Sequence, residues 1–331
     1  MPDKIRWGIL APGTIARKFA VGLQSTPDAE ITAVGARSQE SADRFGDEFN
    51  VPRRHVGYEK LAADPNVDVI YVASPHALHM EQALLCLEHG KAVLCEKPFT
   101  INAAQAQAVI ERARARQLFV MEAMWSRFIP LMTEVRQLIG DGAIGDLRMV
   151  IADFGFRTRF NPQSRLFDPA LGGGGLLDVG VYAVSFASML LGAPNRVASL
   201  AEIGATGVDE QGAAILGYPG GELAMIYTGV RTQTPLETTI MGADGMIQIH
   251  NPSWAPTKMT VKRAGQAPAL VEMPFEGSVY TFQIAEVHRC LRAGKLESDL
   301  MPLDETLAIM ATMDQIRAQW GVHYPMEGVE E

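Results

Sequence analysis

The sequence predicts an α/β protein: an N-terminal doubly wound parallel sheet, then a C-terminal α+β domain with an open, mostly antiparallel sheet. Short apolar runs alternate with helical periodicity from Lys4 to about Val120, which is typical of βαβ units. The pattern then changes to β-rich segments separated by glycine-containing turns. The chain has 331 residues, whereas single cores stop growing at roughly 250–300 residues. We therefore expect domains over residues 1–124 and 125–331, with a C-terminal helix able to pack back on the first.

The first domain should contain short apolar strands that are covered on both faces by helices. The predicted strands are Ile5–Ala11, Ile31–Ala36, Val69–Ser74, Ala92–Cys95 and Phe119–Met121. The predicted helices are Thr14–Gln24, Ser41–Phe49, Leu78–Glu88 and Asn102–Arg116. Open α/β sheets bind ligands at the carboxyl ends of their strands, so the residues that follow each strand are the first candidates for a site.

The second domain begins with a predicted connecting helix, Ile129–Ile139. Its predicted strands are Leu147–Phe156, Ala213–Gly217, Glu222–Tyr227, Glu237–Met241 and Met246–His250. Its predicted helices are Leu177–Leu191, Val279–Ala293 and Leu303–Trp320. Helices do not suffice to cover an open sheet of this size, so we expect a homodimer or homotetramer that assembles through this sheet.

The composition favours a small-molecule partner in the cytoplasm. Hydrophobic residues make up 47% of the chain, and the net charge is -9 without a basic cluster, which argues against nucleic acid and membrane surfaces. We find no leader pattern at the start and no stretch that approaches the roughly 18 apolar residues of a membrane span. The three cysteines have no metal-type spacing and are typical of buried thiols in a reducing compartment.

The first predicted strand runs into Ala11-Pro-Gly13-Thr-Ile-Ala, which has the layout of the dinucleotide turn G-x-G-x-x-G/A with Ala11 in place of the first glycine. Gly13 would let the backbone approach a pyrophosphate, and a helix that starts at Thr14 and Ile15 directs its N–H groups and positive dipole end at the same anion. Such turns also occur for structural reasons alone, so the position after the first strand carries the prediction.

The second predicted strand ends in Ala36-Arg37-Ser38, where a carboxylate would accept hydrogen bonds from the adenosine ribose. The guanidinium of Arg37 and the hydroxyl of Ser38 are suited instead to a 2′-phosphate, which favours NADP over NAD. The alternative is that Arg37 is a solvated surface arginine.

Later strands are followed by Ser74-Pro-His-Ala-Leu-His79 and Cys95-Glu-Lys-Pro98. With the turn around Gly13 and the segment Gly-Gly-Gly-Leu-Leu-Asp178-Val-Gly-Val-Tyr182, these motifs resemble the glucose-fructose oxidoreductase and inositol dehydrogenase family over nearly the entire chain. Glu-Ala-Met-Trp-Ser-Arg-Phe128 and the tyrosine at 182 are similar to the branch that contains dimeric trans-dihydrodiol dehydrogenases and NADP-dependent D-xylose dehydrogenases.

The resemblance implies a cis peptide before Pro98, Lys97 beside the reacting hydroxyl and the nicotinamide ribose, and Tyr182 as the proton-transferring group. It implies cofactor contacts by the residues after the strands and by one arginine, namely Ser74, Pro75, His76, His79, Glu96, Lys97 and Arg127. Substrate contacts are expected from Trp125, Phe156 and Asp178, with core packing as the alternative for Trp125. Two histidines without a third ligand give no metal site.

The chemistry is consistent with these roles. A free tyrosine has a pKa near 10 and is a poor base at neutral pH, whereas a nearby ammonium would stabilise the phenolate of Tyr182. Asp178 lies four residues before Tyr182, so on an α-helix the two share a face, and Asp178 could orient substrate hydroxyls. Alone, Tyr182 would be interpreted as a core residue and Lys97 as a surface residue, and their joint pattern reverses both interpretations.

These observations predict an NADP-dependent oxidoreductase. It would transfer a hydride between nicotinamide and a secondary hydroxyl or carbonyl, or a hemiacetal carbon, of a sugar, polyol or trans-dihydrodiol. One alternative is a dinucleotide-binding regulatory protein without catalysis, although such a protein has no need for Lys97 and Tyr182. Another is an enzyme that uses the nucleotide only structurally or as an internally recycled redox group.

Overall fold

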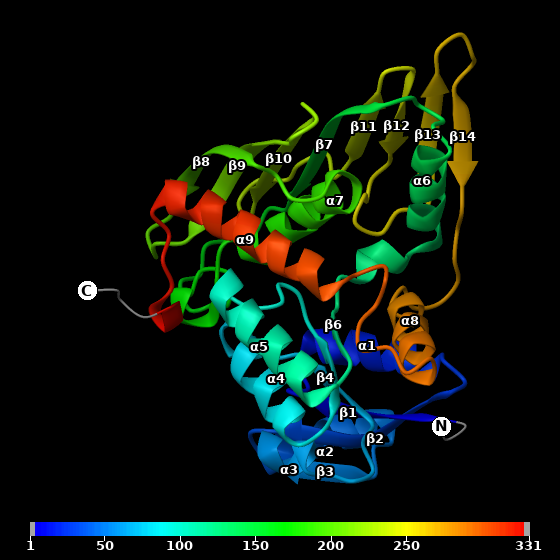
Figure 1. Cartoon of the computed structure of the whole chain (residues 1–331). Coiled ribbons are helices and arrows are strands. Elements are labelled where there is room, and N and C mark those ends of the chain that lie inside the picture. Colours follow the sequence, from blue (N-terminus) through cyan, green and yellow to red (C-terminus); the bar gives the residue numbers. More distant parts are fainter. Residues whose placement is uncertain (1–3, 328–331) are drawn as a thin grey trace. The chain divides into compact units, whose positions relative to one another are not determined.

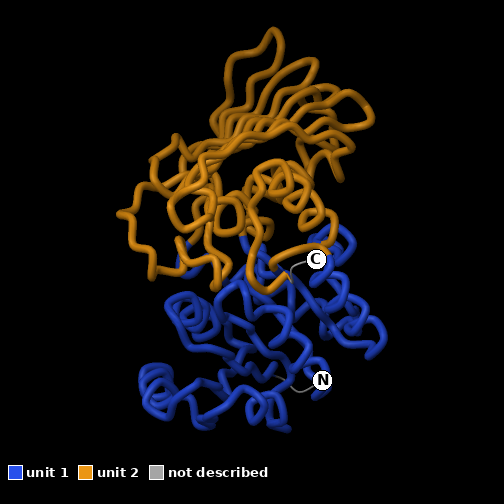
Figure 2. Tube along the Cα trace, turned by 90° about the vertical axis from the view of Figure 1, so that its left-hand side faces the viewer, with its two compact units in different colours: residues 1–100, 104–125, 276–306 blue, residues 101–103, 126–275, 307–331 orange. Residues whose placement is uncertain are grey.

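The computed structural model describes residues 4–327, and the chain divides into two compact units (Figure 2). The first unit comprises Met1–Thr100, Ala104–Trp125 and Glu276–Thr306. The second unit comprises Ile101–Ala103, Ser126–Phe275 and Leu307–Glu331. The chain therefore crosses between the units more often than a single boundary after residue 124 provides for.

The first unit is built on a six-stranded sheet with the order β3-β2-β1-β4-β5-β6 (Figure 1). Every neighbouring pair is parallel, so the predicted doubly wound parallel sheet is confirmed. The strands are β1 Ile5–Leu10, β2 Ala29–Ala36, β3 Arg53–Val56, β4 Val69–Val72, β5 Ala92–Cys95 and β6 Val120–Glu122. The strand order reverses between β1 and β4, which is where sheets of this kind bind dinucleotides.

Helices fill the connections of the first unit. They are α1 Thr14–Gln24, α2 Gln39–Phe49, α3 Tyr58–Ala62, α4 His79–Glu88, α5 Ala103–Arg116 and α8 Thr281–Arg292. Helix α8 belongs to this unit because it packs on α1 at Gly22, where an added Cβ would lie 3.0 Å from Tyr280 Cβ and 3.2 Å from Ile284 Cδ1. The edge strand β3 and the short α3 lack an apolar period, which is why the sequence did not predict them.

The second unit is built on an eight-stranded sheet with the order β14-β13-β12-β11-β7-β10-β9-β8. Only the β7–β10 pair is parallel, so the open, mostly antiparallel sheet is confirmed. The strands are β7 Leu147–Gly155, β8 Arg196–Ile203, β9 Asp209–Gly217, β10 Leu223–Gly229, β11 Thr238–Gly242, β12 Gly245–Ile249, β13 Lys258–Arg263 and β14 Ala269–Glu272. The edge strands β8 and β14 expose most of their residues, which removed the apolar signal that predicts a strand.

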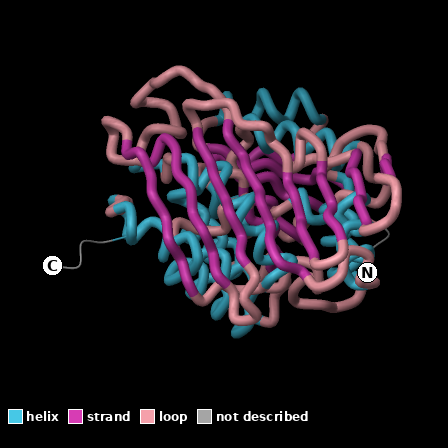
Figure 3. The backbone as a smooth tube through the Cα atoms, turned by 90° about the horizontal axis from the view of Figure 1, so that it is seen from above, coloured by secondary structure: helices cyan, strands magenta, loops and turns pink. Residues whose placement is uncertain are grey.

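One face of this sheet is covered by helices. They are α6 Pro130–Gly140, a π-turn Leu176–Gly180 that leads into α7 Val181–Leu191, and α9 Leu303–Trp320. Helix α7 contacts β7 and β10, and Trp320 of α9 lies against Gly212 of β9. Seen from above in Figure 3, the opposite face carries no helix from residues 4–327.

The segment Pro169–Leu191 passes a test of length and apolar composition for a membrane span, with a mean hydropathy of 1.6. This corrects the expectation that no stretch approaches such a composition. In the structure 72% of the apolar window is buried inside the protein, because α7 lies in the core of the second unit.

Candidate active site

The dinucleotide-type turn joins β1 to α1. Ala11 has a φ of 64°, the left-handed conformation for which glycine is normally used, and Gly13 N–H donates to Ala11 O at 2.7 Å. Gly13 is the N-cap of α1, which has no side-chain cap, and a Cβ added to Gly13 would meet only Ala11 O at 4.0 Å. The N–H groups at Thr14 and Ile15 thus start an uncapped helix with open space beside Gly13, as an anion site requires.

The segment after β2 combines a basic group with a helix start. Ser38 caps α2 by accepting a hydrogen bond from Ser41 N–H at 3.3 Å, and Arg37 is exposed. Tyr58, at the start of α3, faces Arg37: burial raises the pKa of Tyr58, and the Arg37 charge opposes that shift. An exposed guanidinium beside a helix N-terminus is suited to a phosphate.

The motif after β4, Ser74 to His79, is largely buried. His79 is fully buried, and its ring nitrogens lie 2.8 Å from Pro98 O and 3.0 Å from Ser74 O. Burial lowers the pKa of His79, while the Pro98 and Ser74 carbonyls act in the opposite direction. His79 therefore ties the loop after β4 to the loop after β5, and its predicted contact with the cofactor stays a prediction.

Other members of the same motif remain candidates for ligand contact. Pro75 is the N-cap of a short 3₁₀ turn, and the nearly buried His76 ring lies 5.8 Å from the His79 ring. Ser74 is nearly buried, and its Oγ has no hydrogen-bond partner within the described residues. A buried hydroxyl at the carboxyl end of a strand is available to a ligand.

The loop after β5 carries Lys97, and two buried acids accept hydrogen bonds from its backbone. The Lys97–Pro98 peptide bond is cis, as the resemblance implied. Glu96 is buried and accepts hydrogen bonds from Tyr71 Oη and, at 3.2 Å, from Lys97 N–H. The fully buried Glu122 accepts from Phe99 N–H at 3.1 Å. Glu96 therefore directs its carboxylate into the protein and fixes the backbone that carries the half-buried Lys97.

Trp125 and Arg127 are two residues apart in the sequence but belong to different units. The Trp125 ring is 5% exposed and lies 5.5 Å from the ring of Tyr280, within the first unit. Arg127 is buried in the second unit, where it donates to Ser185 Oγ at 2.9 Å and to Ser185 O at 2.6 Å. Arg127 thus fixes α7 one turn beyond Tyr182, and its predicted role toward the cofactor remains untested.

Asp178 lies in the π-turn that precedes α7. It is 4% exposed, and its Oδ1 accepts from Arg165 Nη1 at 2.8 Å. Arg165 belongs to the arginine-containing loop after β7, so this ion pair joins that loop to Asp178. Asp178 lies in the π-turn and Tyr182 is the second residue of α7, so the four-residue spacing crosses a change of helix type, and the expected shared face stays a prediction.

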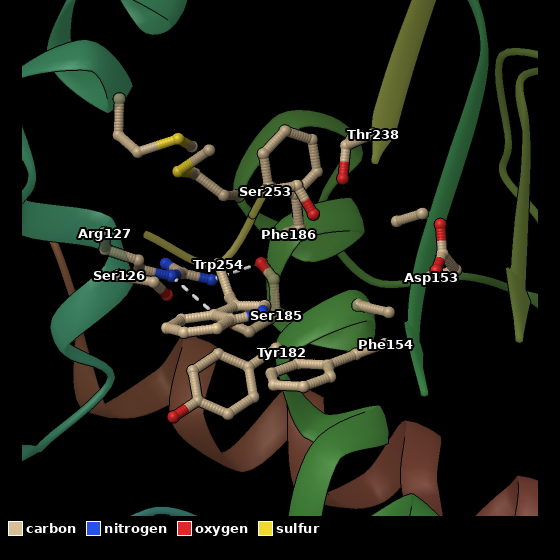
Figure 4. A pocket seen from close by; sticks show the side chains of 14 residues that line it. Ser126, Arg127, Asp153, Phe154, Tyr182, Ser185, Phe186, Thr238, Ser253 and Trp254 are labelled. Atoms are coloured by element: carbon tan, nitrogen blue, oxygen red, sulfur yellow. Dashed lines mark hydrogen bonds between the residues drawn. The ribbon is translucent and has the colours of Figure 1, made fainter. Parts of the chain in front are cut away.

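Tyr182 lies on α7 beside two aromatic residues that the sequence analysis missed (Figure 4). Its ring centroid is 5.2 Å from that of Phe154, which stacks on Trp254 at 5.4 Å with an interplanar angle of 7°. The three rings line one pocket of the second unit, together with Arg127 and Ser185. Phe156 follows the end of β7 and is not among the residues that line this pocket.

A sequence signal existed for one of the two missed residues. Phe154 lies two residues after the buried Ala152 on β7, so strand periodicity places both side chains on the same, helix-covered face. Trp254 comes from the turn after β12, which is brought to α7 only by the fold of the sheet. Nothing local to Trp254 in the sequence indicates that position.

Family models match both parts of the chain. Residues 5–124 match the "Oxidoreductase family, NAD-binding Rossmann fold", and residues 132–248 match the "GFO/IDH/MocA C-terminal domain". The chain belongs to the GFO/IDH/MocA oxidoreductase family. The resemblance noted from the motifs is therefore confirmed, and the protein is a dehydrogenase or reductase with a domain for a nicotinamide dinucleotide.

Curated relatives match over nearly their whole length. The chain is 39% identical to a trans-1,2-dihydrobenzene-1,2-diol dehydrogenase of Mus musculus and 36% identical to one of Homo sapiens, over 98% of this chain and 99% of each relative. Among solved structures, a 3-ketoreductase from Actinomadura kijaniata in complex with NADP is 26% identical with a TM-score of 0.86, covering 95% of this chain and 97% of that chain. A levoglucosan dehydrogenase, 16% identical over 98% of this chain and 100% of that chain with a TM-score of 0.88, shares the fold.

The described residues offer no metal centre. Within residues 4–327, no group of three or more His, Cys, Asp or Glu side chains is arranged to hold a metal ion. The buried acids instead accept hydrogen bonds from backbone N–H groups, as Glu122 and Asp153 do.

Proposed function

We propose that this protein is an NADP-dependent dehydrogenase that oxidises a ring-borne secondary alcohol, of the trans-dihydrodiol or sugar class, and runs in reverse as a reductase. The single observation that carries the proposal is Tyr182, which lies at an aromatic pocket with Phe154 and Trp254 and is preceded by the buried Asp178. Flat aromatic surfaces suit the apolar face of a ring, and a carboxylate suits its hydroxyls. Relatives named for a dihydrodiol substrate support the same class.

The residues present fit a nicotinamide dinucleotide. The uncapped start of α1 and the open side of Gly13 accommodate a pyrophosphate, and the buried Ser74 hydroxyl offers a further polar contact. We assign the 2′-phosphate of NADP to Arg37 and the α2 start at Ser38, because no carboxylate there would repel it. When bound, the dinucleotide supplies or accepts the hydride.

The side chains of this chain supply the proton chemistry. Tyr182 Oη removes the proton of the substrate hydroxyl as the alcohol becomes a carbonyl, and returns it in the reverse direction. The ammonium of Lys97 favours the phenolate and polarises the substrate oxygen. Asp178, held by Arg165, orients the neighbouring hydroxyl of the ring. Glu96 and His79 keep the Lys97 loop in place through their contacts with Lys97 N–H and Pro98 O.

A substrate panel tests the proposal. Trans-dihydrodiols, pentoses, hexoses and anhydrosugars are assayed in parallel with NADP and with NAD by following absorbance of the reduced nicotinamide. We expect turnover with at least one ring-borne diol or sugar and a preference for NADP. Tight NADP binding without turnover on any member would contradict the proposal and support a regulatory dinucleotide-binding protein instead.

We also propose that the protein is a homodimer through the uncovered face of the eight-stranded sheet. The strand register places a row of uncharged side chains across this face, with Ile215 opposite Met225 and Met225 opposite Ile151. Ile215 is 47% exposed and Met225 is 40% exposed, and Leu200 nearby is 84% exposed. A second copy of the same sheet is the partner that matches such a surface, since a two-fold axis pairs the same apolar patch of each subunit with that of the other.

Substitution of Met225 by Lys tests the dimer. Light scattering after gel filtration should give twice the chain mass of 36.0 kDa for the wild type and the chain mass for Met225→Lys. Val21→Lys, at a 48% exposed position on α1, is the control and should not change the mass. A monomeric wild type would contradict the dimer.

We also propose that the protein is located in the cytoplasm. The cysteines Cys86, Cys95 and Cys290 are all buried free thiols, and burial raises the pKa of Cys86 and of Cys290 to about 12. Protonated, inaccessible thiols suit a reducing compartment. Cell fractionation with a tagged chain would test it, and recovery outside the cytoplasm would contradict it.

A further inference from the structure

A fully buried carboxylate outside the predicted site contacts the segment that carries Asp178 and Tyr182. Asp209, the first residue of β9, is 0% exposed, and its Oδ2 accepts from Leu176 N–H at 2.7 Å. Leu176 begins the π-turn, so Asp209 satisfies an N–H group that a helix start leaves unpaired. Gly175 N–H also stabilises the charged form of this carboxylate.

The run of glycines before the π-turn is shaped around this carboxylate. Gly174 has a φ of 113°, and a Cβ added there would lie 2.3 Å from Asp209 Oδ1. A Cβ added to Gly175 would lie 3.2 Å from Asp209 Oδ2. Any side chain at Gly174 would therefore displace the carboxylate, which gives a physical reason for glycine at that position.

Two further side chains hold the same glycines. Tyr324 Oη donates to Gly173 O at 2.6 Å, and Thr228 Oγ1 donates to Gly175 O at 3.1 Å. The segment before Asp178 is thus fixed by three side chains from distant parts of the second unit rather than left as a flexible hinge. Of the three, Asp209 alone contacts the first residue of the π-turn by its side chain.

We propose that Asp209 is a positioning residue for catalysis: by capping the π-turn Leu176–Gly180 it sets where Asp178 and Tyr182 lie. This rests on the proposed function, because it assigns to Asp209 the placement of the two groups that act on the substrate there. Asp209 itself does not touch the substrate. A carboxylate that accepts the N–H of the first residue of a helical segment fixes where that segment starts.

The burial of Asp209 makes this cap sensitive to pH. Burial raises the pKa of Asp209 to about 7, against the opposing effect of the Leu176 and Gly175 N–H groups. The charged and titratable groups that face it are Arg317 of α9, whose charge lowers this pKa, and Tyr324, whose own pKa is raised by burial and by Asp209. Glu327 is bonded to Arg317, and Asp178 lies on the capped turn itself. Protonation removes the negative charge that the helix start favours, so the cap weakens as pH falls through about 7.

Kinetics of Asp209→Asn and Asp209→Ala test the positioning role. We expect kcat to fall by about 10- to 100-fold in Asp209→Ala and by less in Asp209→Asn, which keeps one acceptor, because small displacements of catalytic groups cost rates of this order. The wild-type limb of the kcat profile near pH 7 should be absent in Asp209→Asn. NADPH binding, followed by fluorescence, should stay within about twofold, since a change in kcat without a change in binding marks lost positioning.

Asp64→Asn is the matched control. Asp64 is also a buried carboxylate, 5% exposed, and accepts from Asn66 N–H at 2.9 Å in the first unit. This variant should lose stability but retain kcat and its pH profile. Equal kcat in the wild type and Asp209→Ala would overturn the proposal, as would a loss of kcat in Asp64→Asn as large as that in Asp209→Ala.

Hydrogen exchange provides a readout that does not depend on activity. Amides of residues 174–185 should exchange faster in Asp209→Ala than in the wild type, while those of β10 should not change. Unchanged protection of 174–185 would overturn the proposal even if the enzyme is active. Failure of the wild type to turn over any substrate would instead overturn the proposed function, and hydrogen exchange would still decide whether Asp209 caps this segment.

Discussion

The loops of the first unit and the helical site of the second are held over very different distances along the chain. In the first unit, His79 reaches the carbonyls of Ser74 and Pro98, which are 5 and 19 residues away. In the second unit, the segment before Asp178 is held by Asp209, 33 residues from Leu176, and by Tyr324, 151 residues from Gly173. Contacts between residues close in the chain produce a short motif that can be recognised in the sequence. Contacts between distant residues produce no such motif, and here only the glycines before the π-turn indicate them.

Replacement of Lys97 by Met should have the largest effect. It tests whether the loop after β5 keeps its structure and its cofactor binding when the Lys97 ammonium is removed. Turnover should fall by about 10³-fold or more, because the ammonium that favours the phenolate is lost. NADPH binding should remain measurable by fluorescence, since Glu96 and His79 still hold the loop. Lys60→Met, at an exposed lysine of α3, should behave as the wild type. Full turnover of Lys97→Met would reject the role of Lys97.

Replacement of Arg37 by Ala should have the next largest effect and should be confined to the first unit. The KM for NADP should rise by about 10- to 100-fold, the usual cost of a lost charge-assisted hydrogen bond, while the KM for NAD stays the same. Steady-state kinetics with both dinucleotides measure this. Arg44→Ala removes an exposed arginine of α2 that pairs with Glu40 and serves as the control. An equal rise for NAD and NADP would contradict recognition of the 2′-phosphate.

A buried histidine of the first unit should respond to pH in the opposite sense to Asp209. His288 is 2% exposed, its Nε2 accepts from Trp7 Nε1 at 3.0 Å, and its Nδ1 lies 3.1 Å from Asp28 Oδ2. Burial lowers the pKa of His288 from 6.5, despite the opposing effect of Asp28. Below about pH 6.5 the unfolded state therefore binds more protons, and this contribution to stability is lost as pH falls.

The variant His288→Gln measures this contribution. Its free energy of unfolding in denaturant should depend less on pH below 6.5 than that of the wild type. For Asp209 the pKa is about 7 in the folded state, against 3.8 in the unfolded chain, so between these pH values only the folded state keeps the proton. The free energy of unfolding of the wild type should therefore fall relative to that of Asp209→Asn as pH rises from about 4 to about 7. If His288→Gln and the wild type have the same pH dependence, the assignment of a neutral buried imidazole is wrong.

The smallest effect is expected from Ala11→Gly in the turn after β1. Ala11 has a φ of 64°, so glycine should relieve strain and raise the free energy of unfolding by about 0.5 kcal/mol, after the entropy that glycine adds to the unfolded chain. Thermal unfolding measures the change. The control Ala16→Gly lies buried in α1 and should lower stability by about 1 kcal/mol or more. Destabilisation by Ala11→Gly would contradict the strain.

The sequence predicted the first unit well because its signals are local. The strand β1 and the helix α1 each begin at the predicted residue, and Lys97–Pro98 has the predicted cis bond. Strand β3 was missed because its exposed arginines at an edge do not form an apolar run. The motif residues of the first unit were proposed as site residues for the same reason, since each motif follows an apolar strand.

The sequence predicted less of the second unit because its site depends on distant partners. Tyr182 and Asp178 were singled out by their motif, but the π-turn that contains Asp178 has no sequence signal that we used. Phe154 was overlooked in favour of Phe156, which lies beyond the end of β7. The order of the strands brings Trp254 to α7 and Asp209 to the π-turn before it, and the residues around them do not encode that order.

Transfer of deuterium from a labelled substrate tests the central claim most directly. A cyclic diol or sugar that is turned over would be prepared with deuterium on the carbon that bears the reacting hydroxyl and incubated with NADP. Mass spectrometry of the reduced dinucleotide should show one deuterium per molecule formed, and none when Tyr182→Phe or Lys97→Met replaces the wild type over the same period. Reduced dinucleotide without deuterium, or turnover of substrate with the dinucleotide unchanged, would contradict direct hydride transfer.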